Sequence, residues 1–259
     1  MLLSLQILGL IISWIAYLFR PALLYVWFTK LVSRSSRMAA QNMTGADFPE
    51  ATILENYWKT IRDETQTFLS ELDKDGLPKS GHSSARSAVI PIKSYRVWEG
   101  IATSWFRDTM QLLEMIPMIT TARLVMIGQE HGRVHSVRMF KGLLSYYLPL
   151  ATPKAGTGFI ASDGICHRLE EGHGLLVDET DAHIIYHGST DPLILLSLDV
   201  QRFSSLPSWA RWINHILVRL INSSTRVQEA VRKVEHALAR HHPTIHGLVI
   251  QPSITTLQS

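Results

Sequence analysis

The chain has 259 residues, of which 46% are hydrophobic and 18% charged, so it can bury one sizeable core. Its 25 basic and 22 acidic residues are spread along the chain without a dense Lys/Arg block, which speaks against a nucleic-acid-binding protein. The lone cysteine, Cys166, excludes an internal disulfide framework and a CxxC zinc site, and it favours a reducing compartment. Any bound metal would therefore be held by histidine and carboxylate side chains.

An uncharged apolar segment lies near the N-terminus. It covers residues 2–18, LLSLQILGLIISWIAYL, and a second apolar stretch runs to Phe28. This predicts a membrane anchor within residues 1–30, with a buried core helix as the alternative. Basic residues follow the first stretch and none precedes it, so the positive-inside rule places the remainder in the cytoplasm: Arg20, Lys30, Arg34 and Arg37. Four aromatic residues are candidates for an interfacial belt: Trp14, Tyr17, Tyr25 and Trp27.

The rest of the chain divides by composition. Residues 31–48 read as a short polar connector, residues 49–225 as the main domain, and residues 226–259 as a C-terminal helix and tail. The sequence therefore predicts one main domain behind a membrane anchor.

The first half of this domain has helical spacing. Apolar residues recur at helical intervals from Glu50 onward and predict a long surface helix that ends near Gly76. Residues 77–94 are rich in Ser, Gly and Pro and predict a loop. Residues 104–119 predict a second amphipathic helix that Pro117 stops.

From about Ala122 the pattern changes to short apolar runs separated by Gly, Pro and Asp: ARLVMIG, LLSYYLPLAT, GFIAS, HGLLVDE, HIIYHG and LILLSLDV. This succession predicts a β-sandwich or barrel. Residues 208–242 then return to an amphipathic helical pattern. The expected fold class is mainly β with flanking helices.

The histidines near the ends of these strands are candidate metal ligands. His183 lies between two predicted strands, and His131 and His135 precede the LLSYYLPL strand. Two histidines from separate strands and a third group can build an open iron site in a double-stranded β-helix. The alternative for each is an ordinary turn histidine, which is how we interpret His187, His241 and His242. The acidic residues of the same turn are interpreted as turn caps rather than ligands: Asp178, Glu179 and Asp181.

Three segments in order resemble the aspartyl/asparaginyl β-hydroxylase family, whose members are iron(II) and 2-oxoglutarate dioxygenases: FPEATILENYWKTIRDE, LLSYYLPLATP and CHRLEEGHGLLVDETDAHIIYHGSTDPLILLSLDVQR. The similarity looks closest to the lipid A 2-hydroxylase branch, which also has an N-terminal anchor, a cytoplasmic domain and a Trp-rich helix after the last strand, here SWARWINHILVRLIN. The resemblance implies a double-stranded β-helix, a jelly-roll or cupin-like domain, behind a transmembrane helix. It also implies Fe(II) and 2-oxoglutarate as cofactors, and a lipid acyl chain or a protein side chain as substrate.

By this resemblance His183 is the second iron ligand. In the family, the first iron histidine lies eleven residues before the position that corresponds to Tyr147. In this chain Ser136 stands at that place. A one-residue insertion would bring His135 to that position, and His131 is a poorer candidate.

The cosubstrate pocket departs from the family pattern. An Arg and a His that usually line it correspond to Ser145 and Tyr147, which still share one face of a strand. The arginine that pairs with the distal carboxylate of 2-oxoglutarate, ten residues after His183, corresponds to Leu193. An apolar side chain cannot replace a bidentate cation. Four nearby basic residues are possible substitutes: Arg138, Lys141, Arg168 and Arg202.

Three functions are therefore open. The first is a membrane-anchored dioxygenase with iron held by His135 and His183, and a membrane lipid as partner. The second is a catalytically degenerate family member that serves as a membrane-tethered binding or scaffold subunit, because fold similarity does not by itself preserve chemistry. A cupin-like metal protein with another reaction is a weaker third.

Overall fold

The computed structural model describes residues 22–35, 48–74, 88–127, 133–134, 140–153, 158–162, 165–180, 183–187, 189, 191–203, 206–230 and 233. Its helices are α2 (Ala22–Ser35), α3 (Ala51–Asn56), α4 (Trp58–Lys74), α5 (Gly100–Trp105), α6 (Arg107–Glu114) and α7 (Ser208–Ser223). Its strands are β1 (Ala88–Ser94), β2 (Val97–Trp98), β3 (Ile119–Ile127), β4 (Arg133–Val134), β5 (Leu143–Ala151), β6 (Gly158–Ser162), β7 (Ile165–Arg168), β8 (Leu175–Val177), β9 (His183–His187) and β10 (Leu193–Gln201).

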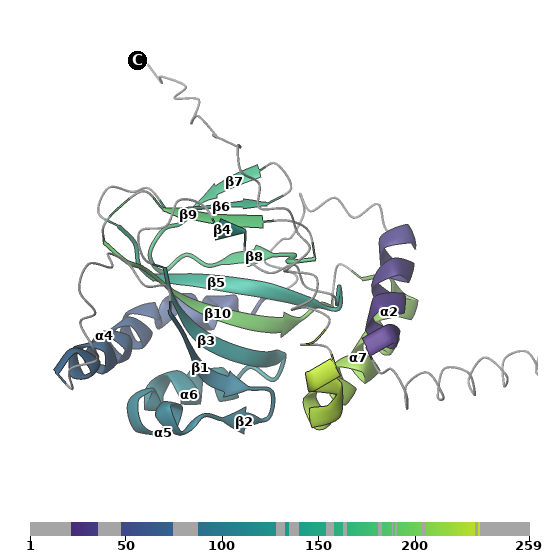
Figure 1. Cartoon of the computed structure of the whole chain (residues 1–259), viewed down its shortest axis with the longest axis horizontal. Coiled ribbons are helices and arrows are strands. Elements are labelled where there is room, and N and C mark those ends of the chain that lie inside the picture. Colours follow the sequence, from purple (N-terminus) through teal and green to yellow (C-terminus); the bar gives the residue numbers. More distant parts are fainter. Residues whose placement is uncertain are drawn as a thin grey trace, which may run out of the picture.

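The strands form two antiparallel sheets that face each other (Figure 1). The larger sheet has the order β2-β1-β3-β10-β5-β8, and the smaller has the order β4-β9-β6-β7. From β3 to β10 the chain passes back and forth between the sheets, which is the winding of an eight-stranded jelly roll. The prediction of a mainly β fold with flanking helices is confirmed.

Both faces of the larger sheet are covered. Because side chains alternate along a strand, Leu196 and Leu198 of β10 pack outward in the cluster that includes α3 to α6. Leu193 and Leu195 point inward and pack with Ile160 and Ile185 of the smaller sheet. This double burial explains why β10 reads as one continuous apolar run.

Two details of the predicted first half differ in the structure. The loop expected over residues 77–94 is wrong at its end, because residues 88–94 form strand β1 beside β3. Strand β2 pairs only with Lys93 and Ser94 of β1, so Pro91 lies on an open edge of the sheet. A proline is tolerated there because no neighbouring strand requires a backbone N–H donor at this position. The helix from Glu50 is interrupted at Tyr57, whose side chain is exposed. Residues 77–87 lie outside the described part of the chain.

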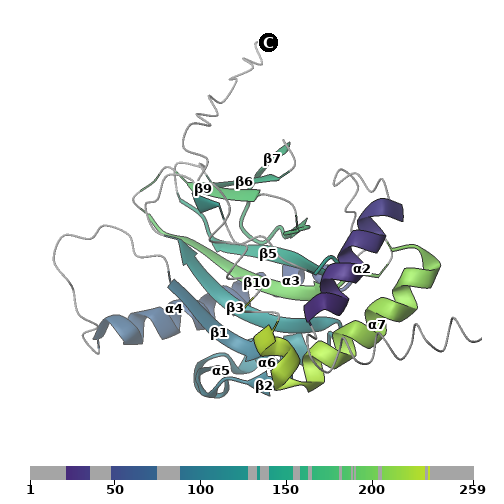
Figure 2. The same cartoon turned by 45° about the vertical axis from the view of Figure 1, so that its right-hand side comes forward.

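Helices α2 and α7 pack side by side at one end of the sandwich (Figure 2). The Tyr25 hydroxyl donates a hydrogen bond of 3.1 Å to the Leu217 carbonyl. Tyr25 is fully buried, so its expected place in an interfacial belt is wrong. Among the described residues, no helix has the length and apolar character needed to span a bilayer. The predicted membrane segment at residues 2–18 lies outside that part of the chain.

Candidate functional site

A cavity of about 610 Å³ lies on the inner face of the larger sheet. Part of its wall is apolar and includes Val125, Leu143 and Ile185. Polar residues that line it include Lys93, Arg123, Tyr147, Glu179, Ser197 and Asp199. The cavity thus combines a guanidinium, carboxylates and apolar surface in one space.

Two oppositely charged side chains that line this cavity form an ion pair. Arg123 Nη2 lies 2.8 Å from Asp199 Oδ1, and the Thr121 hydroxyl donates to Asp199 Oδ2. The register of β3 against β10 sets this pair, because Thr121 faces Asp199 and Arg123 faces Ser197 across the strands. The Arg123 side chain is one-third exposed and lines the cavity while it is bound to Asp199.

Lys93 also borders the cavity, but its side chain lies on the outer face of the sheet, because it pairs with Ala122, whose partner in β10 is the outward-packed Leu198. Its ammonium donates to the Ile119 carbonyl at 3.2 Å and lies 5.2 Å from the ring centroid of Trp98. Burial lowers the pKa of Lys93, while the charge of Glu114 acts in the opposite direction.

The predicted metal ligand His183 is fully buried at the start of β9, opposite Ser162. Its Nε2 atom lies 3.9 Å from Glu179 Oε1. The same Glu179 oxygen accepts a hydrogen bond from the Tyr147 hydroxyl. Three buried side chains, from the turn, β5 and β9, therefore meet beside the cavity.

The structure describes only some of the other predicted site residues. Ser145 faces Asp199 across the β5–β10 pair, Tyr147 faces Ser197, and both side chains are buried. The Ser145 hydroxyl has no hydrogen-bond partner among the described residues. His135 and His131 lie outside the described part of the chain, as does Ser136.

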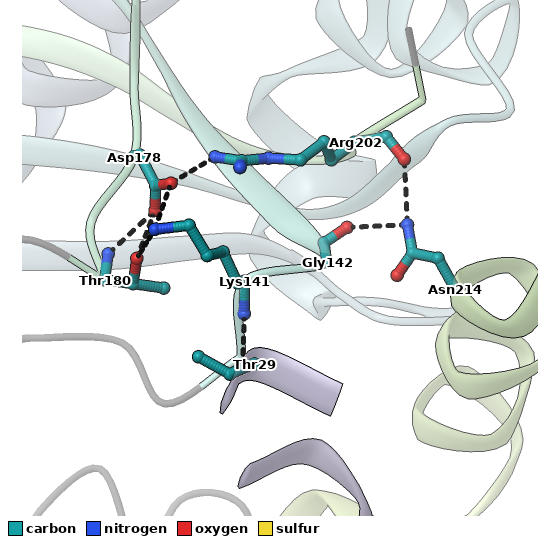
Figure 3. A network of polar contacts seen from close by, with 7 residues as sticks. All are labelled: Thr29, Lys141, Gly142, Asp178, Thr180, Arg202 and Asn214. Atoms are coloured by element: carbon teal, nitrogen blue, oxygen red, sulfur yellow. Dashed lines mark hydrogen bonds and ion pairs between the residues drawn. The ribbon is translucent and has the colours of Figure 1, made fainter. Parts of the chain in front are cut away.

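The turn before His183 is fixed by a second buried cluster (Figure 3). The Asp178 carboxylate pairs with Arg202 and lies 3.4 Å from Lys141 Nζ. Its other oxygen accepts hydrogen bonds from the Thr180 amide at 3.0 Å and the Thr180 hydroxyl at 2.6 Å. Burial opposes ionisation of this carboxyl, but the charges of Arg202 and Lys141 and the bonds from Thr180 outweigh it and lower the pKa of Asp178.

Helix α7 is tied to the same cluster. The Asn214 amide donates to the Gly142 carbonyl at 3.0 Å and to the Arg202 carbonyl at 2.8 Å (Figure 3). A Cβ atom at Gly142 would lie 1.9 Å from Asn214 Oδ1, so this close approach requires glycine. The cluster therefore joins the turn, the end of β10 and α7 into one unit.

Leu193 corresponds, by the resemblance described above, to the family's cosubstrate arginine. It is fully buried at the start of β10, in a cluster with Ile160, Leu169 and Leu195. Of the proposed substitute cations, Lys141 and Arg202 bind Asp178, and Arg168 is exposed. Arg138 lies outside the described residues.

The sequence reasoning missed Arg123, which does line the cavity. A usable signal was present, because Arg123 and Asp199 are single charges inside otherwise uncharged strands, ITTARLVMI and LILLSLDVQ. A charged side chain within a strand faces either solvent or a polar interior. The pairing of β3 with β10 brings these two side chains together.

The residues fit the implied cofactors only in part. His183 and the adjacent Glu179 provide a nitrogen and an oxygen of the types that bind iron. Within the described part of the chain, no group of three or more His, Cys, Asp or Glu side chains is placed to hold a metal. The distal carboxylate of 2-oxoglutarate does not fit beside Leu193, because that cluster is apolar.

Comparisons with known proteins complete this picture. No curated protein matches the chain. Among solved structures, it is similar to a Pseudomonas putida prolyl-4-hydroxylase, with 13% identity and a TM-score of 0.36 over 59% of this chain and 98% of that one. It is also similar to the Cupin_2 domain of an XRE family transcriptional regulator from Enterobacter cloacae, with 13% identity and a TM-score of 0.31 over 44% of this chain and 95% of that one.

Residues 55–203 match the family described as Aspartyl/Asparaginyl beta-hydroxylase. The matched span runs from the end of α3 to just beyond β10 and contains every residue of the cavity wall named above. Membership of this family supports a dioxygenase-type function. Because the match covers more than half of the chain, the protein belongs to the aspartyl/asparaginyl β-hydroxylase family.

Proposed function

We propose that this chain is an iron(II) and 2-oxoglutarate-dependent hydroxylase whose reaction takes place in the cavity between the sheets. The observation that carries the proposal is the meeting of His183, Glu179 and Tyr147 beside a cavity whose wall also bears Arg123. Metal-binding groups and an anion-binding group thus border one space.

His183 and Glu179 would hold the metal. In a facial site, two ligand atoms that each lie about 2.1 Å from one ion are about 3.0 Å apart. His183 Nε2 and Glu179 Oε1 lie 3.9 Å apart, so binding of one ion would draw the two atoms about 1 Å closer together. Non-haem iron(II) sites commonly combine two histidines with a carboxylate, and His135 remains the candidate for the second histidine.

Tyr147 would act as a positioning residue in this site. Its hydroxyl donates to the carboxylate oxygen of Glu179 that lies nearer His183. Hydrogen bonds to ligand side chains orient them toward the metal. When bound, iron(II) with 2-oxoglutarate supplies the oxidising chemistry, and the residues of this chain bind and orient the reactants.

Arg123 would replace the missing cosubstrate arginine. A guanidinium has five N–H donors in a planar fork, so Arg123 can bind Asp199 and a ligand carboxylate at the same time. The carboxylate anchor is thereby moved from β10 to β3.

We further propose a lipid acyl chain at the membrane surface as the substrate, as in the lipid A 2-hydroxylase branch, with a protein side chain as the alternative. The uncharged segment at residues 2–18 would anchor the chain, with the jelly roll on the cytoplasmic side. Flotation of the full chain with lipid vesicles tests the anchor. Recovery with the dense, vesicle-free fraction would contradict it.

A second candidate function is favoured by Leu193. Its apolar surroundings leave no cation at the position where the family binds the distal carboxylate. A family member of this kind would use the cavity to bind a ligand without oxidising a substrate.

An anaerobic titration of iron(II) into the full chain, with and without 2-oxoglutarate, distinguishes the two. The hydroxylase predicts a visible charge-transfer band that saturates at one metal per chain and is lost in His183→Ala. Arg123→Gln should weaken 2-oxoglutarate binding about 30-fold or more, because a charge-assisted bond is removed. The exposed Arg168→Gln is the matched control. Iron binding without the band would favour the degenerate family member.

A further inference from the structure

Helix α7 exposes large apolar side chains in a single stripe. Trp209, Trp212 and Ile216 are all exposed, Trp212 by 71%. Their spacing of three and four residues places them on one face of the helix, and the exposed Arg219 continues the same line. The opposite face is buried through Asn214, Leu217 and Ile221, so the stripe is not part of the core.

The neighbouring helix α2 exposes side chains of the same kind. Leu23 and Trp27 are exposed, Trp27 by 53%, and Lys30 lies one turn further along the same face. The bond between Tyr25 and the Leu217 carbonyl holds α2 against α7. Exposed aromatic and basic side chains therefore occur together on two adjacent helices.

We propose that these exposed faces of α2 and α7, here called the α2–α7 face, lie on the surface of a lipid bilayer. Tryptophan prefers the boundary between headgroups and acyl chains, and nearby basic residues favour anionic lipids. A stripe of exposed tryptophans is otherwise unfavourable on a protein surface in water.

The position of α2 in the chain identifies the bilayer as the occupant. Ala22, the first residue of α2, follows the uncharged segment at residues 2–18 by only three residues. A membrane that holds this segment is necessarily within reach of α2 and of the α7 helix packed against it. The inference therefore rests on the proposed membrane anchor.

The α2–α7 face is also close to the cavity. Ile221 of α7 and Phe140, which packs against Tyr25 and Phe28 of α2, both line it. Contact of this face with lipid would bring the cavity near acyl chains and would fix the orientation of the jelly roll. A lipid substrate would then need to move only a short way out of the bilayer.

Site-specific labelling of the full chain in vesicles tests this contact. In a Cys166→Ser background, an environment-sensitive fluorophore is attached at Trp212→Cys and, as a matched control, at Tyr57→Cys. Tyr57 is exposed by 53% but lies at the α3–α4 junction. Vesicles that contain brominated lipid should quench the label at position 212 at least threefold more than the label at position 57. Arg219→Glu should reduce this quenching on vesicles with anionic lipid and leave it unchanged on neutral ones.

The possible outcomes separate the contact from the anchor. Flotation of the chain with equal quenching at both positions would overturn the contact while the anchor stands. Failure of both flotation and quenching would overturn both proposals. If label at position 212 is shielded without quenching by brominated lipid, and crosslinking yields dimers, the face is an interface with a second copy and the proposal is wrong.

Discussion

Asp178 and Glu179 are consecutive carboxylates of one turn, yet they belong to two different clusters. Asp178 pairs with Arg202 and Lys141 and receives both hydrogen bonds from Thr180. Glu179 points to the other side, where it meets the Tyr147 hydroxyl and the His183 imidazole beside the cavity. Both are buried, so burial alone does not distinguish their roles.

The difference lies in how the charge of each is balanced. Asp178 contacts two cations, and removing its charge would take the counter-charge from the buried Arg202. Glu179 contacts a hydroxyl and an imidazole, and these groups can also serve a carboxylate that binds a metal. The comparison indicates that the first cluster holds the turn in place and that the second presents ligands.

The largest expected effect is the loss of Asp178. Asp178→Asn should lower the free energy of unfolding by about 3 to 5 kcal/mol, because the buried Arg202 would lose the carboxylate that balances its charge. Denaturant unfolding of the full chain measures this change. The exposed Asp191→Asn is the control and should change stability by less than about 0.5 kcal/mol. Equal losses in the two variants would show that the cluster does not hold the turn.

Acidification should break the same cluster. The pKa of Asp178 is lowered from the ordinary value of 3.8, so its contribution to stability is complete above that pH and is lost as the pH falls through the folded-state pKa. The stability difference between the natural chain and Asp178→Asn should therefore shrink as the pH falls below about 4. Unfolding curves at several pH values measure this difference. A difference that stays constant down to pH 2 would contradict the assignment.

A smaller loss is expected where α7 joins the cluster. Asn214→Ala removes the donor to the Gly142 and Arg202 carbonyls and should cost about 1 to 3 kcal/mol. Ser223→Ala, at an exposed position of the same helix, is the matched control. If Asn214→Ala also leaves stability unchanged, α7 is held by its apolar contacts alone.

The sequence was sufficient for the elements whose pattern is local. The apolar runs that became β5 and β10 have the length and composition of buried strands, and their alternation correctly placed Ser145 and Tyr147 on one face. It was insufficient for β1, where Pro91 and nearby serines imitate a loop. That strand exists because β3 supplies a partner, which is a contact between distant parts of the chain.

The candidate site, too, could be predicted from the sequence only where the contacts are local. Asp178 does cap its turn through Thr180, as its position beside a turn predicts. The neighbouring Glu179 was assigned the same role, and its contacts with Tyr147 and His183 depend on how β5, the turn and β9 meet in space. A resemblance to a family pointed to Leu193, but only the sheet register shows that Arg123 stands on the cavity wall.

The smallest effect on stability is expected at Glu179, where the comparison between the two clusters is sharpest. Glu179→Gln keeps an oxygen that can accept the Tyr147 hydroxyl, so the free energy of unfolding should fall by less than in Asp178→Asn, by about 1 kcal/mol. The same substitution should weaken binding of iron(II) at least tenfold, because it replaces an anionic ligand with a neutral one. Denaturant unfolding and anaerobic metal titration of the same preparations measure the two effects, with Glu170→Gln, at an exposed position, as control. A large loss of stability with unchanged metal affinity would place Glu179 with Asp178 in the cluster that holds the turn.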